Sequence, residues 1–116
     1  MVKMSTPSKR KGSAWELAIA KYLVEKGWIY AERRIAGSNV DKGDLNGIIG
    51  CVIEAKNEKK ITLSDYLKEL EVEMKNAKAK TGVVMVKKKG TTDVGQGYAV
   101  MPIDVWVELM KEAGYQ

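Results

Sequence analysis

The chain of 116 residues is long enough for one domain with a single modest core and too short for two. Its hydrophobic content of 45% and charged content of 30% are ordinary for a globular protein. No apolar run approaches the roughly 20 residues that cross a bilayer, and the N-terminus lacks the apolar core of a signal peptide, so we expect no membrane partner. Cys51 is the single cysteine and has no internal disulfide partner, which favours a reducing cytoplasmic setting, inside a host cell if the protein is viral.

Net charge and the lack of histidine narrow the chemistry. A formal net charge of +5 favours a polyanionic partner, although a basic protein without such a partner has the same composition. Because the chain has no histidine, Ser-His-Asp and Cys-His nucleophile systems, histidine-ligated zinc sites and nucleases with a histidine base are excluded. Any catalysis therefore depends on carboxylates and lysines, with or without a hard metal ion.

The first 12 residues are polar and basic, which predicts a flexible arm ahead of a single domain over residues 13–116. An arm of this kind suits contacts with phosphate groups, and a solvated tail is the alternative. The first helix is predicted from Ala14 to about Lys26, with Ser13 as its N-cap.

Glu16 has two interpretations. It lies three residues after Ser13, the spacing of a capping box, so it could simply cap the helix. At about 100° per residue, however, it shares a face with the core-facing Ile19, Ala20 and Leu23. A carboxylate on an apolar face is costly unless it is paired or binds a metal. We therefore favour a functional role for Glu16.

A first strand is predicted over 28–35, and it ends in the basic pair Arg33-Arg34. A loop rich in turn-forming residues follows over 36–43. Its glycines, Ser38 and Asn39 offer donors that suit a phosphate group, and a plain connecting loop is the alternative.

Two further strands are predicted over 44–49 and 51–56, and the short glycine-containing link between them favours an antiparallel hairpin. Strand alternation places Val52, Glu54 and Lys56 on one face, with Glu54 and Lys56 about 6–7 Å apart along the strand. A surface ion pair at an exposed strand end is the alternative. The apolar residues directly before Glu54 favour an interior strand.

A second helix is predicted to begin after Thr62 or Ser64 and to end at about Lys78. Its apolar residues form one stripe that suits packing on a sheet. The charged residues expected on the other face are Lys68, Glu69, Glu71, Glu73, Lys75 and Lys78. Charged residues of this kind usually only solvate the exposed face of a helix, although Lys75 could reach a ligand.

The last part of the chain predicts two more strands, over 81–86 and 97–101, and a terminal helix over 102–113. The predicted order is α-β-β-β-α-β-β-α, which is an α/β fold. Apolar residues near the C-terminus are candidates for the core, our default, or for a dimer interface: Met101, Val105, Trp106, Leu109 and Met110.

Asp44, Glu54 and Lys56 are the residues with the clearest chemistry. Two carboxylates at the open end of a hairpin suit a hard cation such as Mg²⁺, with Mn²⁺ as a substitute. The carbonyl of Ala55 would add an oxygen ligand, and Glu16 would bind a second ion or orient the first. Such an ion generates a hydroxide near neutral pH, and a neighbouring lysine orients the attacking water or neutralises negative charge. Phosphodiester hydrolysis needs this set of groups and needs no histidine.

These elements resemble the PD-(D/E)xK nuclease superfamily: a helix with Glu16, then Asp44, then Glu54-Ala55-Lys56 on an apolar strand. The opening Arg10-Lys11-Gly12-Ser13 and the Gly37-Ser38 loop are similar to those of archaeal-type and phage Holliday-junction resolvases. The similarity covers the chain from about residue 9 to residue 86. It implies a restriction-endonuclease-like core with a central mixed sheet of about five strands flanked by helices, Mg²⁺-dependent cleavage of branched DNA, and a homodimer with two active sites.

By this resemblance, Asp44 and Glu54 would bind the metal, Lys56 would assist the water, and Glu16 would be the helix carboxylate of the site. The family's motif usually has proline before the aspartate, where this chain has Gly43, so Asp41 remains an alternative to Asp44. Ser38 would lie near the scissile phosphate, and we expect DNA contacts from a set of basic and hydroxyl residues: Lys9, Arg10, Lys11, Ser13, Arg33, Arg34, Ser38 and Lys75.

We therefore expect a structure-selective DNA endonuclease, most simply a Holliday-junction resolvase that acts on four-way junctions in DNA recombination and repair. The same fold could instead cleave flaps, single strands or duplex DNA. A third alternative, from a different class, is a non-catalytic basic DNA-binding module whose acids are structural.

Overall fold

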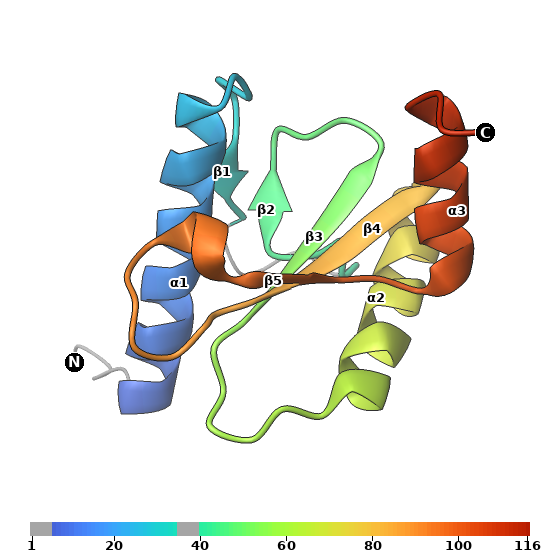
Figure 1. Ribbon diagram of the computed structural model, residues 1–116. Coiled ribbons are helices and arrows are strands. Elements are labelled where there is room, and N and C mark those ends of the chain that lie inside the picture. The colour runs from blue at the N-terminus through green and yellow to red at the C-terminus, as the bar shows by residue number, and fades with distance from the viewer. Residues whose placement is uncertain (1–5, 35–39) are drawn as a thin grey trace.

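The computed structural model describes residues 6–34 and 40–116, and over these the chain has the predicted order of helices and strands (Figure 1). A short 3₁₀ helix, η1, is added before the last strand. The elements are α1 (Pro7–Glu25), β1 (Glu32–Arg33), β2 (Leu45–Asn46), β3 (Cys51–Lys56), α2 (Leu63–Ala77), β4 (Thr81–Val86), η1 (Val94–Gln96), β5 (Tyr98–Val100) and α3 (Ile103–Glu112).

The described strands form two small sheets. In the larger sheet β4 is central, parallel to β3 and antiparallel to β5. In the smaller sheet β1 pairs with β2 in antiparallel register. The α/β class is confirmed, whereas the single sheet of about five strands is not what the described residues form.

The predicted hairpin between the second and third strands is also wrong, because β2 pairs with β1 and not with β3. Gly47 and Gly50 have φ values of +92° and +79°, and they turn the chain so that β2 stops after Asn46. One backbone hydrogen bond, from Asp44 N to Ile53 O at 2.9 Å, still holds the start of this segment against β3.

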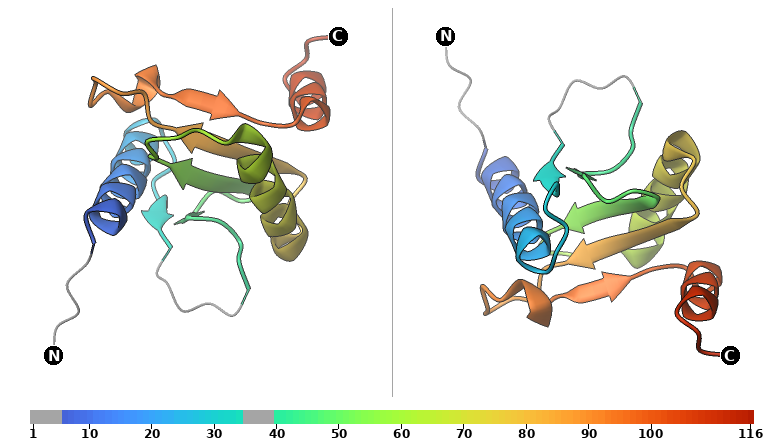
Figure 2. Two further views of the ribbon diagram at one scale, coloured as in Figure 1. Left: turned by 90° about the horizontal axis from the view of Figure 1, so that it is seen from below. Right: turned by 90° about the horizontal axis from the view of Figure 1, so that it is seen from above.

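Two helices cover opposite faces of β3 and β4 (Figure 2). Alternation sends Ile53 and Val83 toward α1, where they join a core that includes Trp15, Ile19 and Leu23. The next residues along each strand, Val52 and Val84, point the other way and pack against Tyr66 and Leu70 of α2. Glu54 and Lys56 follow Val52 in this alternation and therefore also face α2.

The first helix begins earlier than predicted. Thr6 is its N-cap, and the Thr6 hydroxyl accepts a hydrogen bond from Lys9 N at 3.2 Å. Pro7 occupies the first turn, where its missing N–H costs nothing, so Thr6-Pro7 outcompetes Ser13 as the start signal. Of the arm predicted over residues 1–12, the part from Pro7 onward is helical, and residues 1–5 lie outside the described part of the chain.

The first strand is shorter than predicted, because Trp28, Ile29 and Tyr30 lie in turns after Gly27 and are exposed. By contrast, the predicted bounds of β3 and β4 are confirmed, and α2 begins after Thr62 as expected. The terminal helix is confirmed too, but none of its residues is fully buried and Trp106 is 51% exposed, so α3 does not belong to the core as our default assumed. No helix within 6–34 or 40–116 is long and apolar enough to span a membrane.

Candidate active site

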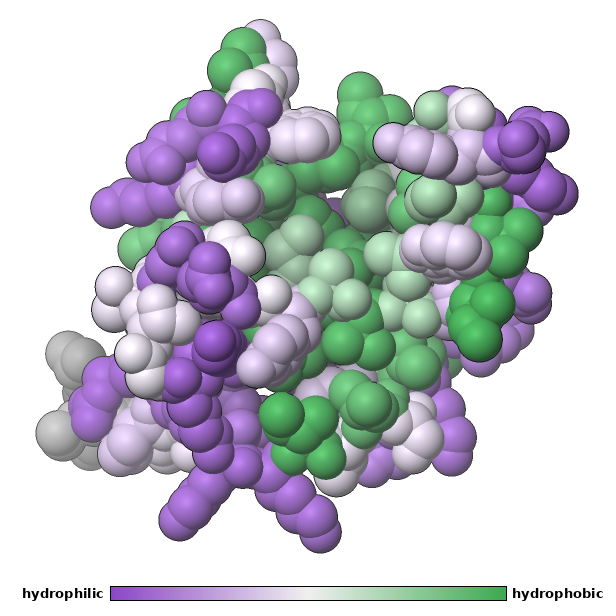
Figure 3. All heavy atoms as spheres, viewed as in Figure 1, coloured by the Kyte–Doolittle hydropathy of each residue, from purple (hydrophilic) through white to green (hydrophobic). Residues whose placement is uncertain are grey.

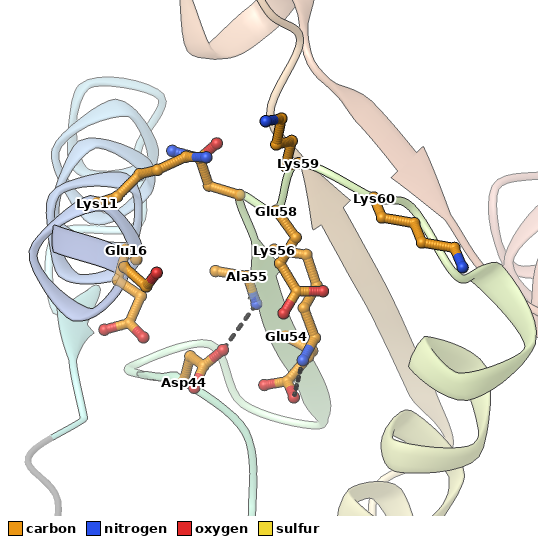
Figure 4. Close-up of a pocket in the computed structure, with 12 residues that line it drawn as sticks. Lys11, Glu16, Asp44, Glu54, Ala55, Lys56, Glu58, Lys59 and Lys60 are labelled. Carbon is orange, nitrogen blue, oxygen red and sulfur yellow. Dashed lines mark hydrogen bonds and ion pairs between the residues drawn. The ribbon is translucent and has the colours of Figure 1, made fainter. Parts of the chain in front are cut away.

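A pocket of about 630 Å³ opens where β3 ends, between the first half of α1 and the segment that follows β3 (Figure 4). It contains each of the residues proposed for catalysis and metal binding on sequence grounds, which come from α1, β3 and the segment before β2. The residues that line it are Ser8, Lys11, Gly12, Glu16, Asp44, Glu54, Ala55, Lys56, Asn57, Glu58, Lys59 and Lys60.

Asp44 is placed by its backbone and its side chain together. Asp44 N donates to Ile53 O at 2.9 Å, and Asp44 Oδ2 accepts from Ala55 N at 2.8 Å. The carboxylate is thereby held against the edge of β3, where it lines the pocket (Figure 4).

Gly43 explains why this chain departs from the proline-aspartate pattern. Its φ is +97°, a value that proline, which is fixed near −65°, cannot adopt. Its N–H donates to Asp41 Oδ1 at 3.0 Å, and proline has no N–H to donate. A Cβ at this position would lie 2.9 Å from Ile53 O, so only glycine lets the backbone come close enough for Asp44 to reach Ala55.

The carbonyl of Ala55 faces the same side as Asp44. The backbone groups of one strand residue point to the same edge, and those of the next residue point to the other edge. Lys56 O accepts from Lys87 N at 3.0 Å on the β4 side, whereas Ala55 N points to Asp44. The predicted oxygen ligand is therefore oriented toward the carboxylate that would share its ion.

Glu54 is a buried carboxylate without a donor for one of its oxygens. The residue is 5% exposed, and Oε1 has no hydrogen-bond partner among the described residues. Burial, and after it the side chains of Asp44 and Glu69 and the charge of Glu73, raise the pKa of Glu54 to about 12. Without a cation Glu54 holds a proton at neutral pH, and a bound cation would replace that proton.

Lys56 lies on the same face as Glu54, as alternation predicted. Its Nζ is 3.9 Å from Glu54 Oε2 and 3.0 Å from Glu69 Oε2, and it sits 5.1 Å from the centre of the Tyr66 ring. Burial alone would lower the pKa of Lys56, but the hydrogen bond to Glu69 and the charges of Glu54, Glu69 and Glu58 outweigh it and raise that pKa. Lys56 is therefore a cation in the pocket and not a general base.

Glu16 reaches the pocket from α1, on the opposite face of the sheet from the Glu54 side chain. It is half-buried and forms an ion pair with Arg33 Nε at 2.5 Å, and Arg33 Nη2 donates to Ser13 Oγ at 3.0 Å. The capping-box interpretation is wrong because the helix starts at Pro7. Arg33 and Ser13 position this carboxylate, and their predicted contacts with DNA stay predictions.

Asp41, the alternative to Asp44, lies elsewhere. Its carboxylate is next to that of Glu73, and its backbone carbonyl accepts from Asn76 Nδ2 at 2.7 Å. Asp41 is therefore turned toward α2, while Asp44 lines the pocket with Glu54 and Ala55.

The other residues predicted to bind DNA are scattered. Lys11 lines the pocket, and Lys9 and Arg10 are exposed on the first turns of α1. The backbone N–H of Arg34 donates to Asp44 O at 2.8 Å, which ties this basic residue to the site. Lys75 is exposed beside Glu71 at 3.8 Å and does not line the pocket, and Ser38 lies outside the described residues.

Sequence reasoning missed residues on both sides of the pocket. Lys59 and Lys60 line its mouth directly after β3. Glu73 was assigned to the solvated face of α2 but is 1% exposed. The sequence did indicate that Glu73 faces the core. At 100° per residue Glu73 is only about 20° from Tyr66 around the helix, inside the apolar stripe. The reasoning applied to Glu16 would have singled out Glu73 as well.

Comparison of the chain with protein-family models, with characterised proteins and with solved structures finds no match. Function must therefore be inferred from the residues and from their arrangement.

Proposed function

We propose that this protein is a metal-dependent, structure-selective DNA endonuclease with a restriction-endonuclease-like core, acting on Holliday junctions or related branched DNA. The observation that carries the proposal is the convergence of Asp44, Glu54 and Lys56 in one pocket whose mouth is basic. These are the residues that the PD-(D/E)xK resemblance selected, and they meet although they come from two separate segments.

The pocket fits a Mg²⁺ ion by the chemistry of its donors. Asp44 and Glu54 supply carboxylate oxygens, Ala55 supplies a carbonyl directed to the same side, and Glu54 Oε1 has no other partner among residues 6–34 and 40–116. All of these are oxygen ligands, which Mg²⁺ and Mn²⁺ prefer. When bound, Mg²⁺ would lower the pKa of a water and stabilise negative charge on the phosphate.

The side chains of the pocket have separate tasks in this proposal. The Lys56 ammonium orients the attacking water and neutralises charge that develops at the phosphate. Glu16, held by Arg33, orients water or a second ion from the α1 side. Lys11, Lys59 and Lys60 bind the phosphates next to the scissile bond, which suits the net charge of +5 (Figure 4).

The preference for branched DNA and the homodimer come from the resemblance to Holliday-junction resolvases. A feature that supports a dimer is an apolar groove of about 730 Å³ whose lining includes Trp28, Ile49, Met85, Met101 and Leu109. Ile49 is fully exposed at its edge, and Figure 3 shows apolar surface hollowed between α1 and α3. Exposed apolar patches of this kind commonly mark protein interfaces.

Cleavage of DNA with and without a branch tests the proposal. A labelled four-way junction, a flap, a single strand and a linear duplex of the same sequence would each be incubated with the protein and Mg²⁺. We expect symmetric nicks at the junction, no cleavage in excess chelator, and loss of cleavage in Asp44→Asn, Glu54→Gln and Lys56→Met. Equal cleavage of the linear duplex would show that the protein is a nuclease without a preference for branched DNA.

Glu71→Gln is the matched control, because Glu71 is an exposed acid of α2 that pairs with Lys75 and does not line the pocket. It should cleave like the wild type. Metal-independent binding to DNA without any cleavage would leave only a DNA-binding module, and undiminished cleavage by Asp44→Asn and Glu54→Gln would rule out the assigned site.

A further inference from the structure

A second group of carboxylates lies on the α2 side of Glu54. Glu69 and Glu73 are four residues apart on α2, so their side chains extend from the same face of the helix one turn apart. Both face Glu54 of β3, and one oxygen from each of the three carboxylates lies within 4.8 Å of the others. Asp44 is not part of this group.

Two of these carboxylates are buried, and each has one oxygen without a donor. Glu54 is 5% exposed and Glu73 is 1% exposed, and Oε1 of each has no hydrogen-bond partner in the described part of the chain. A buried carboxylate oxygen without a donor or cation is costly. Lys56 brings one ammonium, 3.0 Å from Glu69 and 3.9 Å from Glu54, to a group of three acids. One ammonium therefore serves three acids, and a bound cation would take the place of protons that the buried acids hold without it.

We infer that Glu54, Glu69 and Glu73 form a second binding site for a hard divalent cation, in addition to the ion proposed for Asp44, Glu54 and Ala55. Glu54 is the ligand shared by the two sites, one on each side of it. This inference concerns metal binding alone and does not depend on whether the protein cleaves DNA.

The ligands determine the class of ion. All three are carboxylates, which suit Mg²⁺, Mn²⁺ or Ca²⁺ and not the softer ions that prefer sulfur or imidazole. Two ligands of one Ca²⁺ ion, at about 2.3–2.6 Å each, are at most about 5 Å apart, while those of Mg²⁺, at about 2.0–2.1 Å, are at most about 4.2 Å apart. Three oxygens within 4.8 Å of one another therefore need a small closure around Ca²⁺ and a larger one around Mg²⁺ or Mn²⁺.

Access to the site is through Glu69. Its side chain is 47% exposed, whereas Glu73 and Glu54 are buried. An ion can enter at Glu69 and keep waters on its outer positions, as Mg²⁺ and Mn²⁺ usually do. Asp41, beside Glu73, is placed to support that ligand or to bind one of those waters.

The experiment counts ions on the full chain in the absence of DNA. Mn²⁺ binding would be measured by calorimetry and by the EPR signal of free Mn²⁺, with Ca²⁺ as the second probe. The variants are Glu69→Gln and Glu73→Gln for the new site, Asp44→Asn for the site at the pocket, and Glu71→Gln as a control on the same helix. Circular dichroism checks that each variant is folded, and Glu→Gln keeps the side-chain volume so that packing is preserved.

We expect Glu69→Gln and Glu73→Gln to bind one ion fewer than the wild type, or to bind that ion at least about 10-fold more weakly. Asp44→Asn should retain the ion on the α2 side, and Glu71→Gln should match the wild type. Wild-type stoichiometry and affinity in both Glu69→Gln and Glu73→Gln would overturn the inference, as would loss of all binding in Asp44→Asn. A protein that binds this ion but cuts no DNA would contradict only the proposed function.

Discussion

The two faces of the β3–β4 pair are built differently. On the α1 face, Trp15, Ile19 and Leu23 pack against Ile53 and Val83 in an apolar core, and a carboxylate at its rim, Glu16, is paired with Arg33. On the α2 face, Tyr66 and Leu70 make a smaller core, which gives way to buried acids.

The contrast separates residues that stabilise the fold from residues that do not. Buried acids without donors work against stability, so a chain retains them for another purpose. We therefore propose that the α2 face, together with Asp44, provides the sites for cations, whereas the apolar core of the α1 face serves to stabilise the fold. Substitutions on the two faces should accordingly have opposite consequences for stability and for function.

Glu54→Gln should have the largest effect, and only on function. It removes the charge that would bind a cation, while keeping the volume of a side chain that is already protonated in the metal-free protein. We expect cleavage of a four-way junction to fall by at least about 10³-fold. Thermal unfolding without metal should be unchanged, and a large loss of stability would mean that Glu54 is structural.

Ile19→Ala should reduce the stability of the fold and leave metal binding and cleavage unchanged. Ile19 is fully buried in the α1 face, so truncation should cost about 2–5 kcal/mol of unfolding free energy, measured by urea denaturation. The bound ions and the cleavage rate of the folded fraction should stay at wild-type values. Loss of metal binding in the folded variant would show that the two faces are not separable.

Gly43→Ala tests the connection that carries Asp44. The added Cβ would meet Ile53 O at 2.9 Å at a φ of +97°, so we expect a cost of about 1–3 kcal/mol and weaker metal binding at Asp44. Gly90→Ala is the matched control, because Gly90 has φ +87° but open space around it. An equal effect of the two substitutions would assign the cost to φ alone and not to the approach to β3.

The pH dependence of stability should follow Glu54 and Glu73, and Glu73 is the one whose shift ends near neutral pH. Burial and the neighbouring Asp41 raise its pKa from 4.5 to about 8 in the folded protein. The folded state therefore holds this proton more tightly than the unfolded state, and the stabilisation is complete below about pH 4.5 and is lost as the pH rises to about 8. The melting temperature without metal should fall across that window, and the fall should be smaller in Glu73→Gln.

Divalent cations should change that profile. Since a cation binds the ionised carboxylates, Mn²⁺ should raise the melting temperature more at pH 8 than at pH 5. Melting temperatures of Glu73→Gln measured with and without Mn²⁺ at the same two pH values are the control. An equal rise at both pH values would contradict a site made of these acids.

The smallest effect on stability should come from Arg33→Gln. Its ion pair with Glu16 joins side chains that are 45% and 18% exposed, and such pairs contribute about 0–1 kcal/mol. Thermal unfolding should shift little, and the shift should shrink further in high salt. A larger loss would place this pair in the structural framework of the α1 face.

Local sequence determined much of this protein. Continuous apolar runs with turn residues at their ends set β3 and β4, and a stripe of apolar residues set α2, whose first turn follows Thr62 although the Thr62 side chain makes no capping hydrogen bond. Period-two alternation correctly put Glu54 and Lys56 on one face, because that relation depends on the backbone of one strand alone. The motif from Asp44 to Lys56 was likewise readable, since its residues are close in the chain.

Tertiary structure decided the remaining features of the fold and the site, because these features depend on contacts between distant segments. Only the packing of α2 on β3 brings Glu69 and Glu73 to Glu54, and only Arg33 from β1 shows what holds Glu16. The short strands β1 and β2 have too few residues for a period to be seen, so their pairing follows from the turns at Gly47 and Gly50. The carboxylates that surround Glu54 could be found one by one in the sequence, but their meeting in one place is a property of the fold.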